Sequence, residues 1–499
     1  MPSYNPPHTS RTPHTFQQSG RMQVNRLLNA GRAPVLCMPT GTGKTFTAGL
    51  VTGDRVKMGE RIFVLTPSIE IHNQWVREFH EQGIPAGTIN DKGVTGRGMS
   101  VYVAMPMSLN NMLSVLPEKF APDGIINDEC HHSEAASWLN IHRFYPRAWR
   151  IGLTATPERY DGLPLSNTYT DIVSTITPRE AIDGGFLSDY LLIVPEQYAL
   201  DVQVQNGEYN LDEQAAQLGK PRIIGDVITQ YSGIFAGLPC LVACSTHEHA
   251  RKMTEEFKAA GWNFEHIHSG LPPYERARML KGIRKGTING LCTVGIGIEG
   301  LDIPGLYGLI WLRRTMSVTV YLQFIGRVLR RAEGKKYGII LDPVGNVFIH
   351  GRPDMERVWS LEGRAARVEA EEGVPKMKIC PACKVMNAEI NVLCHICGYD
   401  FTSEREKGPG RAFPAMVDGK LVILDADRLE ARKEAIKEAL EGQRTARVGG
   451  AHQGGDFSGE GAESEHGGAT PGRDRKIALL KNGLKSKGGL FSGAVKEWL

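Results

Sequence analysis

The feature of this sequence that most constrains its fold is a glycine-rich turn between a short apolar run and a helical pattern. The segment MPTGTGKTFTAGL (38–50) directly follows the apolar residues of VLCM. Gly41 and Gly43 allow backbone N–H groups to curl around phosphate oxygens at the start of a helix, where the helix dipole favours negative charge. Lys44 is placed to reach the terminal phosphates, and the Thr45 hydroxyl is placed to hold Mg²⁺. Together these features predict a nucleotide site in a parallel α/β domain.

An acidic pair follows a second apolar run. The segment APDGIINDECHH (121–132) contains Asp128 and Glu129 directly after its apolar residues. An acidic pair at the carboxyl end of a strand near a phosphate loop suits two roles. Asp128 would hold Mg²⁺ through water, and Glu129 would orient and deprotonate an attacking water. His131 is a candidate link to another domain. A zinc site in the Cys-His-His run is not expected, because three consecutive side chains do not easily face one metal.

The pattern of apolar runs predicts two successive α/β domains, over residues 14–185 and 186–371. Short, turn-bounded apolar runs alternate with amphipathic segments in both regions, which is typical of parallel βαβ packing. The expected strands are 35–38, 61–66, 101–105, 124–126 and 150–154 in the first domain, and 240–245, 264–269, 290–294, 308–312 and 337–342 in the second.

Composition excludes some classes of protein but leaves nucleic-acid binding open. The 499 residues have a formal net charge of +3 and are 41% hydrophobic, which excludes a polycation and a wholly disordered chain. Nucleic-acid binding needs only a local basic groove, so a near-neutral average does not exclude it. The polar N-terminus does not resemble a signal peptide, and no run is long enough to span a membrane. The nine cysteines predict a reduced, intracellular protein rather than a disulfide framework.

Three polar side chains recur at helical spacing in QFIGRVLR (323–330). Gln323, Arg327 and Arg330 are related as i, i+4 and i+7, so one face of a helix would carry all three. An arginine at a γ-phosphate stabilises the charge of the transition state and raises the rate by ~10³–10⁵. An arginine supplied from the second domain in this way would make hydrolysis depend on closure of the two domains.

Taken together, these segments resemble a superfamily-2 helicase of the DEAD/DEAH type over about residues 14–365. The motifs, in the order of the family, are Phe16-Gln17-Gln18 (glutamine motif), PTGTGKT (39–45, motif I), LTPSIEIHNQW (65–75, Ia), VAMPMSL (103–109, Ib), DECH (128–131, II), LTATP (153–157, III), VGIGIEGLDIP (294–304, V) and QFIGRVLR (323–330, VI). Motif I departs from the general phosphate-loop pattern, which begins with glycine where this chain has Met38. The resemblance implies two tandem RecA-like parallel-sheet domains that use ATP and Mg²⁺.

The resemblance also implies roles for individual residues. Arg327 and Arg330 would face the γ-phosphate, with Arg330 as the better candidate for the arginine finger. The nucleotide contacts would be Gln17 or Gln18 at the adenine, the loop residues Thr40, Gly41, Thr42, Gly43, Lys44 and Thr45, and Gly300 and Asp302 of motif V. Residues that couple hydrolysis to domain movement would be His131, Thr154 and Thr156.

Contacts to a nucleic-acid strand are expected in motif Ia, at Thr66, Pro67 and Ser68. In the family such contacts reach the backbone of the strand, so binding is expected to be independent of base sequence. Trp75 in the same motif is interpreted as a packing residue rather than a platform for a base.

Four cysteines predict a small metal site after the second domain. In KICPACKVMNAEINVLCHICGYDF (378–401), two CxxC pairs are separated by ten residues. Two such knuckles close a tetrahedral Zn²⁺ site, and four thiolates make it structural rather than catalytic. The expected ligands are Cys380, Cys383, Cys394 and Cys397. A two-domain motor followed by this ribbon resembles bacterial RadD-type repair helicases and similar phage helicases, which implies a cytoplasmic location in a bacterial or phage-infected bacterial cell.

The rest of the chain divides into shorter segments with distinct composition. The expected segments are a flexible leader (1–13), a zinc ribbon (376–403), a linker and helix (404–448, with the helix at 427–440), a glycine-rich tether (449–472) and a C-terminal tail (473–499). The tail ends in an apolar cluster, which makes it a candidate for docking a protein partner.

The sequence therefore predicts an ATP-dependent DNA helicase or translocase that acts on single-stranded or branched DNA in replication, recombination or repair. An RNA helicase, and a branch-migrating or restriction-type translocase that does not separate strands, remain alternatives. A catalytically silent scaffold is disfavoured, because Lys44, Asp128, Glu129 and Arg330 are all present.

Overall fold

The computed structural model describes residues 11–195, 204–205, 208–235, 237–294 and 305–363, and five short stretches at 377–380, 386–388, 392–394, 398–400 and 421–423. Several predicted features lie outside these described residues, namely Gly300, Asp302, Cys383, Cys397, the helix 427–440, the tether and the tail.

The first domain is built on one sheet of eight strands, in the order β4-β3-β5-β2-β6-β7-β1-β8. The strands are β1 (Pro34–Cys37), β2 (Ile62–Leu65), β3 (Ala86–Asn90), β4 (Gly93–Val94), β5 (Val101–Ala104), β6 (Gly124–Asp128), β7 (Trp149–Thr154) and β8 (Asp171–Ser174). Neighbouring strands are parallel except for the β3–β4 pair. The strands β1, β2, β5 and β6 are buried along their whole length, which explains their continuous apolar sequences.

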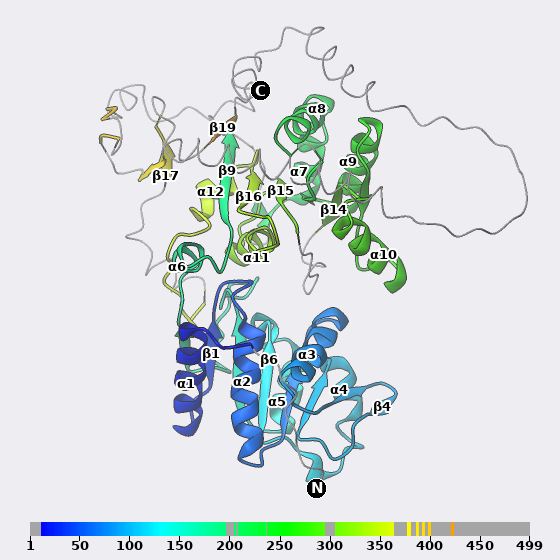
Figure 1. The fold of residues 1–499 in the computed structure, drawn as a ribbon, viewed down its shortest axis with the longest axis vertical. Helices are drawn as coiled ribbons and strands as arrows, with labels where there is room; N and C mark the ends of the chain where they lie inside the picture. Colours follow the sequence, from blue (N-terminus) through cyan, green and yellow to red (C-terminus); the bar gives the residue numbers. More distant parts are fainter. Residues whose placement is uncertain are drawn as a thin grey trace, which may run out of the picture.

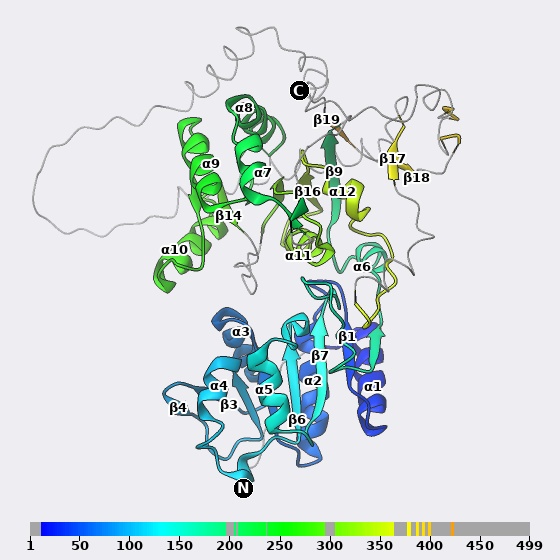
Figure 2. The same ribbon diagram turned by 180° about the vertical axis from the view of Figure 1, so that it is seen from behind.

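Helices cover both faces of this sheet. The helices α1 (Thr15–Asn29), α2 (Lys44–Lys57) and α3 (Ile69–Glu81) lie on one face (Figure 1), and α4 (Pro106–Met112) and α5 (Ala136–Phe144) lie on the other (Figure 2). Apolar side chains of the first three helices belong to one buried cluster, and those of α4 and α5 belong to another. Each layer therefore buries one apolar helix stripe against the sheet.

The second domain repeats this architecture with seven strands, in the order β13-β14-β12-β15-β16-β9-β19. The strands are β9 (Asp189–Pro195), β12 (Cys240–Cys244), β13 (Phe264–His266), β14 (Gly290–Val294), β15 (Gly308–Leu312), β16 (Tyr337–Leu341) and β19 (Leu421–Ile423). The helices are α7 (Leu211–Leu218), α8 (Pro221–Gln230), α9 (His247–Ala259), α10 (Pro273–Arg284), α11 (Val318–Val328) and α12 (Asn346–His350), with a π-helical turn at Tyr231–Phe235. Two small hairpins pair β10 (Val204–Gln205) with β11 (Glu208–Tyr209), and β17 (Met377–Ile379) with β18 (Met386–Ala388).

Two details differ from the expectations drawn from the sequence. The segment 404–448, interpreted as a linker and helix, contributes strand β19, which pairs antiparallel with β9 at the edge of the second sheet. Arg11, assigned to a flexible leader, forms an ion pair with Glu81 at 2.9 Å and lies over the ring of Phe46. The sequence did not reveal either feature, because a three-residue strand and a single arginine carry no periodic signal.

The two domains lie one above the other, with α6 (Pro178–Asp183) between them and α11 on the side of the second domain that faces the first (Figure 1). The carboxyl ends of the adjacent strands β6, β7 and β1 carry motifs II, III and I, so the predicted nucleotide residues gather at one edge of the first sheet. Among the described residues, no helix is long and apolar enough to cross a membrane.

Candidate functional site

The phosphate loop leaves β1 and enters α2 at Lys44. Gly41 and Gly43 have φ angles of 94° and 88°, which only glycine adopts at little cost. A Cβ atom at Gly43 would lie 2.6 Å from Nε2 of Gln17, so a larger residue there would displace this side chain. The Lys44 ammonium donates a hydrogen bond to the carbonyl of Met38 at 3.0 Å. The loop therefore surrounds a helix N-terminus, which favours an anionic group.

The acidic pair lies at the end of β6, and its backbone is strained. Glu129 has a φ of 49°, and it is the one non-glycine residue with a positive φ in the described part of the chain. Such strain persists only where the surrounding structure holds it, commonly at functional sites. The left-handed conformation of Glu129 turns the chain between Asp128 and the short 3₁₀ turn Cys130–His132.

The electrostatics at this edge of the sheet favour a bound cation and a bound anion. Burial, and then the charge of Glu129, raise the pKa of Asp128 to about 7. Burial lowers the pKa of Lys44. A divalent cation beside Asp128 and phosphate groups beside Lys44 would each favour the charged form of these side chains. Asp128 and the Thr45 hydroxyl are the groups that would hold Mg²⁺, which prefers oxygen ligands and would offset the negative charge of the phosphates.

Trp75 is a member of this site that the sequence analysis assigned to packing alone. Its side chain is fully buried, and its indole N–H donates a hydrogen bond to Oδ2 of Asp128 at 2.7 Å. The other carboxylate oxygen, Oδ1, accepts from the backbone N–H of Glu129 at 3.0 Å. Both bonds fix the orientation of the carboxylate. The packing prediction was correct but incomplete, because the sequence alone could not reveal which polar atom the indole would reach.

A cavity of about 410 Å³ lies next to the phosphate loop, on the side of the predicted glutamine motif. Gln17 lines this cavity and donates a hydrogen bond to the carbonyl of Thr42 at 3.0 Å. Gln18 instead accepts from Arg21 at 3.4 Å within α1. The sequence left both glutamines open; of the two, Gln17 lines this cavity, and a contact of either with the base stays a prediction. Phe186 stands across the cavity from the loop, with its ring 4.9 Å from that of Phe16.

The phosphate side is a cavity of about 340 Å³ that residues of both domains line. The first domain contributes Lys44, Thr45, Asp128 and Glu129, and the second contributes Gln323, Arg327, Arg330 and Arg331. The close approach of the domains depends on small residues, because a Cβ atom at Gly326 would lie 2.7 Å from the Cβ of Thr40.

The predicted helical face of motif VI is only partly formed. The helix α11 ends at Val328, so Gln323 and Arg327 lie on it but Arg330 lies beyond it. Arg330 instead forms an antiparallel bridge with Leu187 and packs over Gly41 of the phosphate loop. The i, i+4, i+7 interpretation was therefore wrong for Arg330, although all three side chains reach the same cavity.

Lys335 stabilises the segment that follows α11. Its buried ammonium donates hydrogen bonds to the carbonyls of Leu306, Val328 and Arg330, the first at 2.6 Å and the last at 2.9 Å. Burial, and then the charge of Arg330, lower the pKa of Lys335 to about 7. The sequence shows only a lysine in a basic stretch, so this role was not predicted.

The proposed coupling residues are buried in the first domain, at the carboxyl ends of β6 and β7. His131 is buried, with Nδ1 3.5 Å from Oε2 of Glu129. Thr154 and Thr156 are fully buried, and the Thr154 hydroxyl donates to the carbonyl of Thr156 at 3.1 Å and accepts from its N–H at 3.0 Å. The backbone N–H of Met38 donates to the carbonyl of Thr154 at 3.2 Å, which connects motif III directly to the strand that carries the phosphate loop.

The expected nucleic-acid residues lie where β2 ends and α3 begins. Thr66 is fully buried, whereas Pro67 and Ser68 are half-buried, and Ser68 caps the helix by accepting from the N–H of Ile71 at 3.3 Å. Thr66 can therefore contribute backbone groups more readily than its hydroxyl.

An ion pair that the sequence analysis did not predict crosses between the domains at this point. Arg276 of α10 lies 2.9 Å from Glu70 of α3, and their side chains are 17% and 25% exposed. The pair connects the motif Ia helix of the first domain to the second domain. The two residues are 206 positions apart, so only the tertiary structure reveals the contact.

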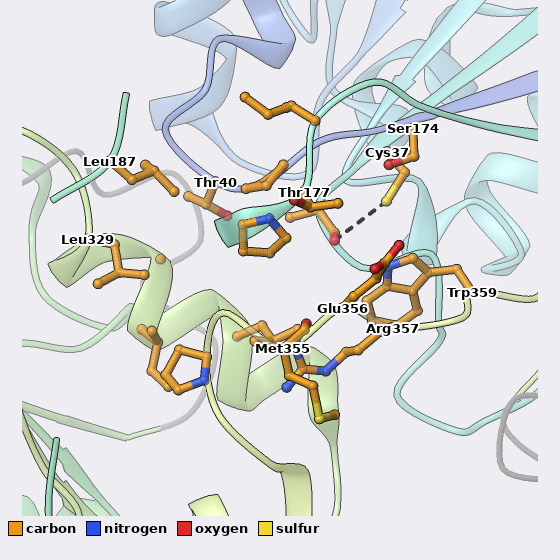
Figure 3. A pocket seen from close by; sticks show the side chains of 18 of the residues that line it. Cys37, Thr40, Ser174, Thr177, Leu187, Leu329, Met355, Glu356, Arg357 and Trp359 are labelled. Atoms are coloured by element: carbon orange, nitrogen blue, oxygen red, sulfur yellow. Dashed lines mark hydrogen bonds between the residues drawn. The ribbon is translucent and has the colours of Figure 1, made fainter. Parts of the chain in front are cut away.

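A separate cavity of about 240 Å³ lies behind the phosphate loop. Figure 3 shows Thr40, Ser174 and Thr177 on one side of it and Met355, Arg357 and Trp359 on the other. An interface with unfilled space allows domains to change their relative position with less displacement of packed side chains.

Two of the four predicted zinc ligands lie within the described residues. Cys380 and Cys394 are buried in one small cluster with Tyr399. Gly398, with a φ of 71°, donates its N–H to the carbonyl of Cys394 at 2.9 Å. Cys383 and Cys397 lie outside the described part of the chain, and no cluster of three ligands occurs among the residues within it. The four-cysteine site therefore stays a prediction.

Comparisons with known proteins agree with this geometry. Residues 14–159 match the family model for the type III restriction enzyme, res subunit, and residues 227–332 match the helicase conserved C-terminal domain. A 51.5 kDa protein of a Lactococcus phage (isolate 7-9) is 30% identical over 371 residues, which is 74% of this chain and 78% of the relative.

Other relatives are longer proteins of which this chain covers less than half. A protein named as a helicase in Sulfolobus islandicus filamentous virus is 28% identical over 246 residues, which is 45% of this chain and 43% of the relative. The type I restriction enzyme EcoAI endonuclease subunit of Escherichia coli is 27% identical over 215 residues, which is 40% of this chain and 25% of the relative.

Among solved structures, a fragment assigned to the HsdR subunit of a type I restriction enzyme from Vibrio vulnificus YJ016 has a TM-score of 0.56 at 21% identity, covering 69% of this chain and 66% of that one. At this level of identity the likeness shows the fold alone. Fold and site together define a P-loop ATPase with two RecA-like domains. The chain belongs to the superfamily-2 helicases, and it is an enzyme whose hydrolysis of ATP, with Mg²⁺, depends on nucleic acid.

Proposed function

We propose that this protein is an ATP-driven DNA helicase or translocase whose two domains close around the nucleotide. The observation that carries the proposal is the single cavity that Lys44 and Glu129 of the first domain share with Arg327 and Arg330 of the second. Hydrolysis at such a site requires both domains to be in place, so each turnover can be coupled to a change in their relative position.

Within this cavity different side chains have different roles. Lys44 and the N–H groups of the loop bind the phosphates, and Glu129 orients the attacking water and accepts its proton. Arg330, with Arg327 beside it, stabilises the charge that develops on the γ-phosphate. Thr66, Pro67 and Ser68 are proposed to hold the nucleic-acid backbone, so that movement of the domains displaces the strand.

The proposal of DNA rather than RNA rests on the relatives. Two of them are endonuclease subunits of type I restriction enzymes, and a structure of similar fold is titled as a type ISP restriction-modification enzyme bound to DNA. The resemblance to RadD-type and phage helicases favours single-stranded or branched DNA in replication, recombination or repair. RNA remains the alternative substrate.

The substrate is tested by measuring ATP turnover side by side with single-stranded DNA, duplex DNA, forked DNA and RNA. We expect single-stranded or forked DNA to stimulate turnover most strongly. Stronger stimulation by RNA would replace DNA with RNA as the substrate. Equal, unstimulated turnover with all four would contradict a nucleic-acid motor.

Strand separation and translocation on duplex DNA are distinguished by a second pair of assays. A helicase displaces a labelled strand from a forked duplex. A restriction-type translocase displaces a triplex-forming oligonucleotide from intact duplex DNA without separating its strands. We expect strand displacement from the fork.

We further propose that Cys380, Cys383, Cys394 and Cys397 hold one structural Zn²⁺. The burial of Cys380 and Cys394 in one cluster and the hydrogen bond from Gly398 to Cys394 support this proposal. Metal analysis of the purified chain is expected to find one zinc per molecule, and none after replacement of Cys380 and Cys394 by serine. Zinc that persists in that variant would contradict the four-cysteine site.

A further inference from the structure

Motif III is followed by a tight turn that projects one aromatic side chain toward the second domain. In this turn, residues 158–162, Arg159 forms a two-point ion pair with Asp161, and the N–H of Gly162 donates to the carbonyl of Arg159 at 3.0 Å. The ion pair with Arg159 lowers the pKa of Asp161, so the pair stays charged at neutral pH. The ion pair therefore holds the turn in one conformation. Tyr160, at the tip of the turn, is half-buried.

Tyr160 contacts both halves of the nucleotide site. Its hydroxyl donates a hydrogen bond to Oε1 of Gln323 in motif VI at 3.2 Å. Its ring meets the ring of His131 in motif II edge to face, with centroids 4.9 Å apart and an interplanar angle of 75°. His131 in turn lies 3.5 Å from Glu129 through its Nδ1 atom. A continuous series of contacts thus leads from the second domain to the carboxylate that activates water.

A second contact from the same turn supports this arrangement. The Thr319 hydroxyl, on α11, donates to the carbonyl of Glu158 at 3.0 Å, and both residues are buried. The turn is therefore attached to α11 at two points, one at its base and one at its tip. Movement of α11 relative to the first domain must change the position of Tyr160.

We propose that Tyr160 is a positioning residue, which transmits the position of motif VI through His131 to Glu129 and so makes hydrolysis depend on domain closure. The proposal rests on the ATPase motor described above and adds to it a residue outside the recognised motifs. A tyrosine suits the role, because its ring is rigid and keeps the hydroxyl and the His131 contact at a fixed separation.

The variant Tyr160→Phe tests this role, because it keeps the ring and removes only the hydroxyl. We expect the nucleic-acid-stimulated kcat to fall about 3- to 10-fold, the effect of one interdomain hydrogen bond. The KM for ATP should stay unchanged, because Tyr160 does not line the cavity for the base or the phosphates. Tyr102→Phe is the matched control: it removes a tyrosine hydroxyl that donates to the carbonyl of Gly96 at 3.0 Å within the first domain.

A double-mutant cycle separates transmission from general packing. If Tyr160 acts through Gln323, then Tyr160→Phe should have no further effect on kcat in a Gln323→Ala background. The variant Tyr160→Leu, which also loses the ring contact with His131, should lower kcat more than Tyr160→Phe does, while the Tm of both variants stays close to that of the wild type.

The outcomes distinguish this proposal from the motor itself. Wild-type protein without nucleic-acid-stimulated ATP turnover would overturn both. Stimulated wild-type turnover with an unchanged kcat in Tyr160→Phe, or additive effects of Tyr160→Phe and Gln323→Ala, would overturn the role of Tyr160 and leave the motor standing.

Discussion

The two domains share the order of seven strands but differ in chemistry. Strands β1, β2, β3, β5, β6, β7 and β8 occupy the same positions, in the same chain order, as β9, β12, β13, β14, β15, β16 and β19. Yet only β1 is followed by a phosphate loop, and only β6 is followed by an acidic pair. The comparison shows that the fold supplies positions for loops, and that the loops determine what each domain does.

Corresponding strand ends show how the second domain differs. Where β6 leads to Asp128 and Glu129, its counterpart β15 leads to Arg313 and Thr315. Arg313 is buried, and Thr315 donates its hydroxyl to Glu208 at 2.7 Å and its N–H to an oxygen of Asn346. These groups bind other parts of the same domain, so this edge is used for internal structure instead of for a nucleotide.

One feature is shared by both domains. Ser68 caps α3 after β2, and Thr246 caps α9 after the corresponding strand β12 by accepting from the N–H of His249 at 3.1 Å. A helix start that requires only a capping hydroxyl is retained in both copies. The residues of the phosphate loop and the acidic pair occur in the first domain alone. The protein therefore has one nucleotide site, which the two domains complete together.

The largest effect on ATP turnover is expected from Lys44→Ala, which tests whether the phosphate loop of the first domain binds the nucleotide. Removing the ammonium is expected to abolish ATP turnover while nucleic-acid binding stays measurable, because the strand contacts lie elsewhere. Lys57→Ala, at the exposed end of the same helix, is the control. Normal turnover in Lys44→Ala would falsify the assignment of the phosphate loop.

Arg330→Ala tests the contribution of the second domain. We expect kcat to fall by about 10³-fold or more, as for other arginine fingers, with ATP still bound by the first domain. Fluorescent-nucleotide binding and steady-state turnover measure the two effects separately. The exposed Arg284→Ala on α10 is the control. A loss of nucleotide binding equal to the loss of kcat would show that Arg330 binds ATP rather than the transition state.

Trp75→Phe removes the indole N–H that bonds Asp128 but keeps an aromatic ring in the core. We expect the Mg²⁺ concentration for half-maximal turnover to rise about 10- to 100-fold, which is typical when a partner of a metal ligand is lost. Trp138→Phe, a buried indole on the other face of the sheet, is the control for packing. An unchanged requirement for Mg²⁺ would limit Trp75 to packing.

Lys335→Met removes the ammonium that donates to the carbonyls of Leu306, Val328 and Arg330, and it should loosen the segment that carries Arg330. We expect kcat to fall about 10-fold with little change in the KM for ATP. The exposed neighbour Lys336→Met is the control. An equal loss in both variants would contradict the role of Lys335.

Lys335 should also affect how stability depends on pH. Its pKa is lowered from the ordinary 10.5 to about 7 in the folded chain, so the unfolded chain binds more protons between these values. The contribution of Lys335 to stability therefore rises with pH from about 7 to about 10.5. Urea unfolding at pH 7 and pH 9 should show a smaller rise for Lys335→Met than for the wild type.

The smallest effect is expected from the ion pair between Glu70 and Arg276. Glu70→Gln should raise the nucleic-acid concentration for half-maximal ATP turnover about 2- to 5-fold, because a partly exposed pair contributes little. Glu265→Gln, which breaks a pair with Arg278 inside the second domain, is the control. The charge-swapped variant Glu70→Arg with Arg276→Glu should recover most of the loss. No recovery would indicate that the two residues act independently.

Much of the fold could be predicted because buried parallel strands read as continuous apolar runs. All ten strands expected from these runs are present, with ends that differ by a few residues. Some of the missed strands, such as β4, β8 and β19, are short or lie at edges, where partial exposure removes the apolar signal. The strand β9 was missed although it is buried inside the sheet and its sequence DYLLIVP (189–195) contains an apolar run. The helix of motif VI was likewise predicted to include Arg330, although α11 ends at Val328, because spacing alone cannot show where a helix ends.

The sequence by itself determined the phosphate loop, the acidic pair and the arginines of motif VI, because each role requires particular residue types at fixed local spacing. The tertiary structure alone decided which residues complete the site. Trp75 reaches Asp128, Tyr160 reaches Gln323, Lys335 binds the carbonyl of Arg330, and Arg276 pairs with Glu70. Except for the Lys335 contact, these pairs join residues far apart in the chain, and no local pattern of hydrophobicity or charge records such contacts.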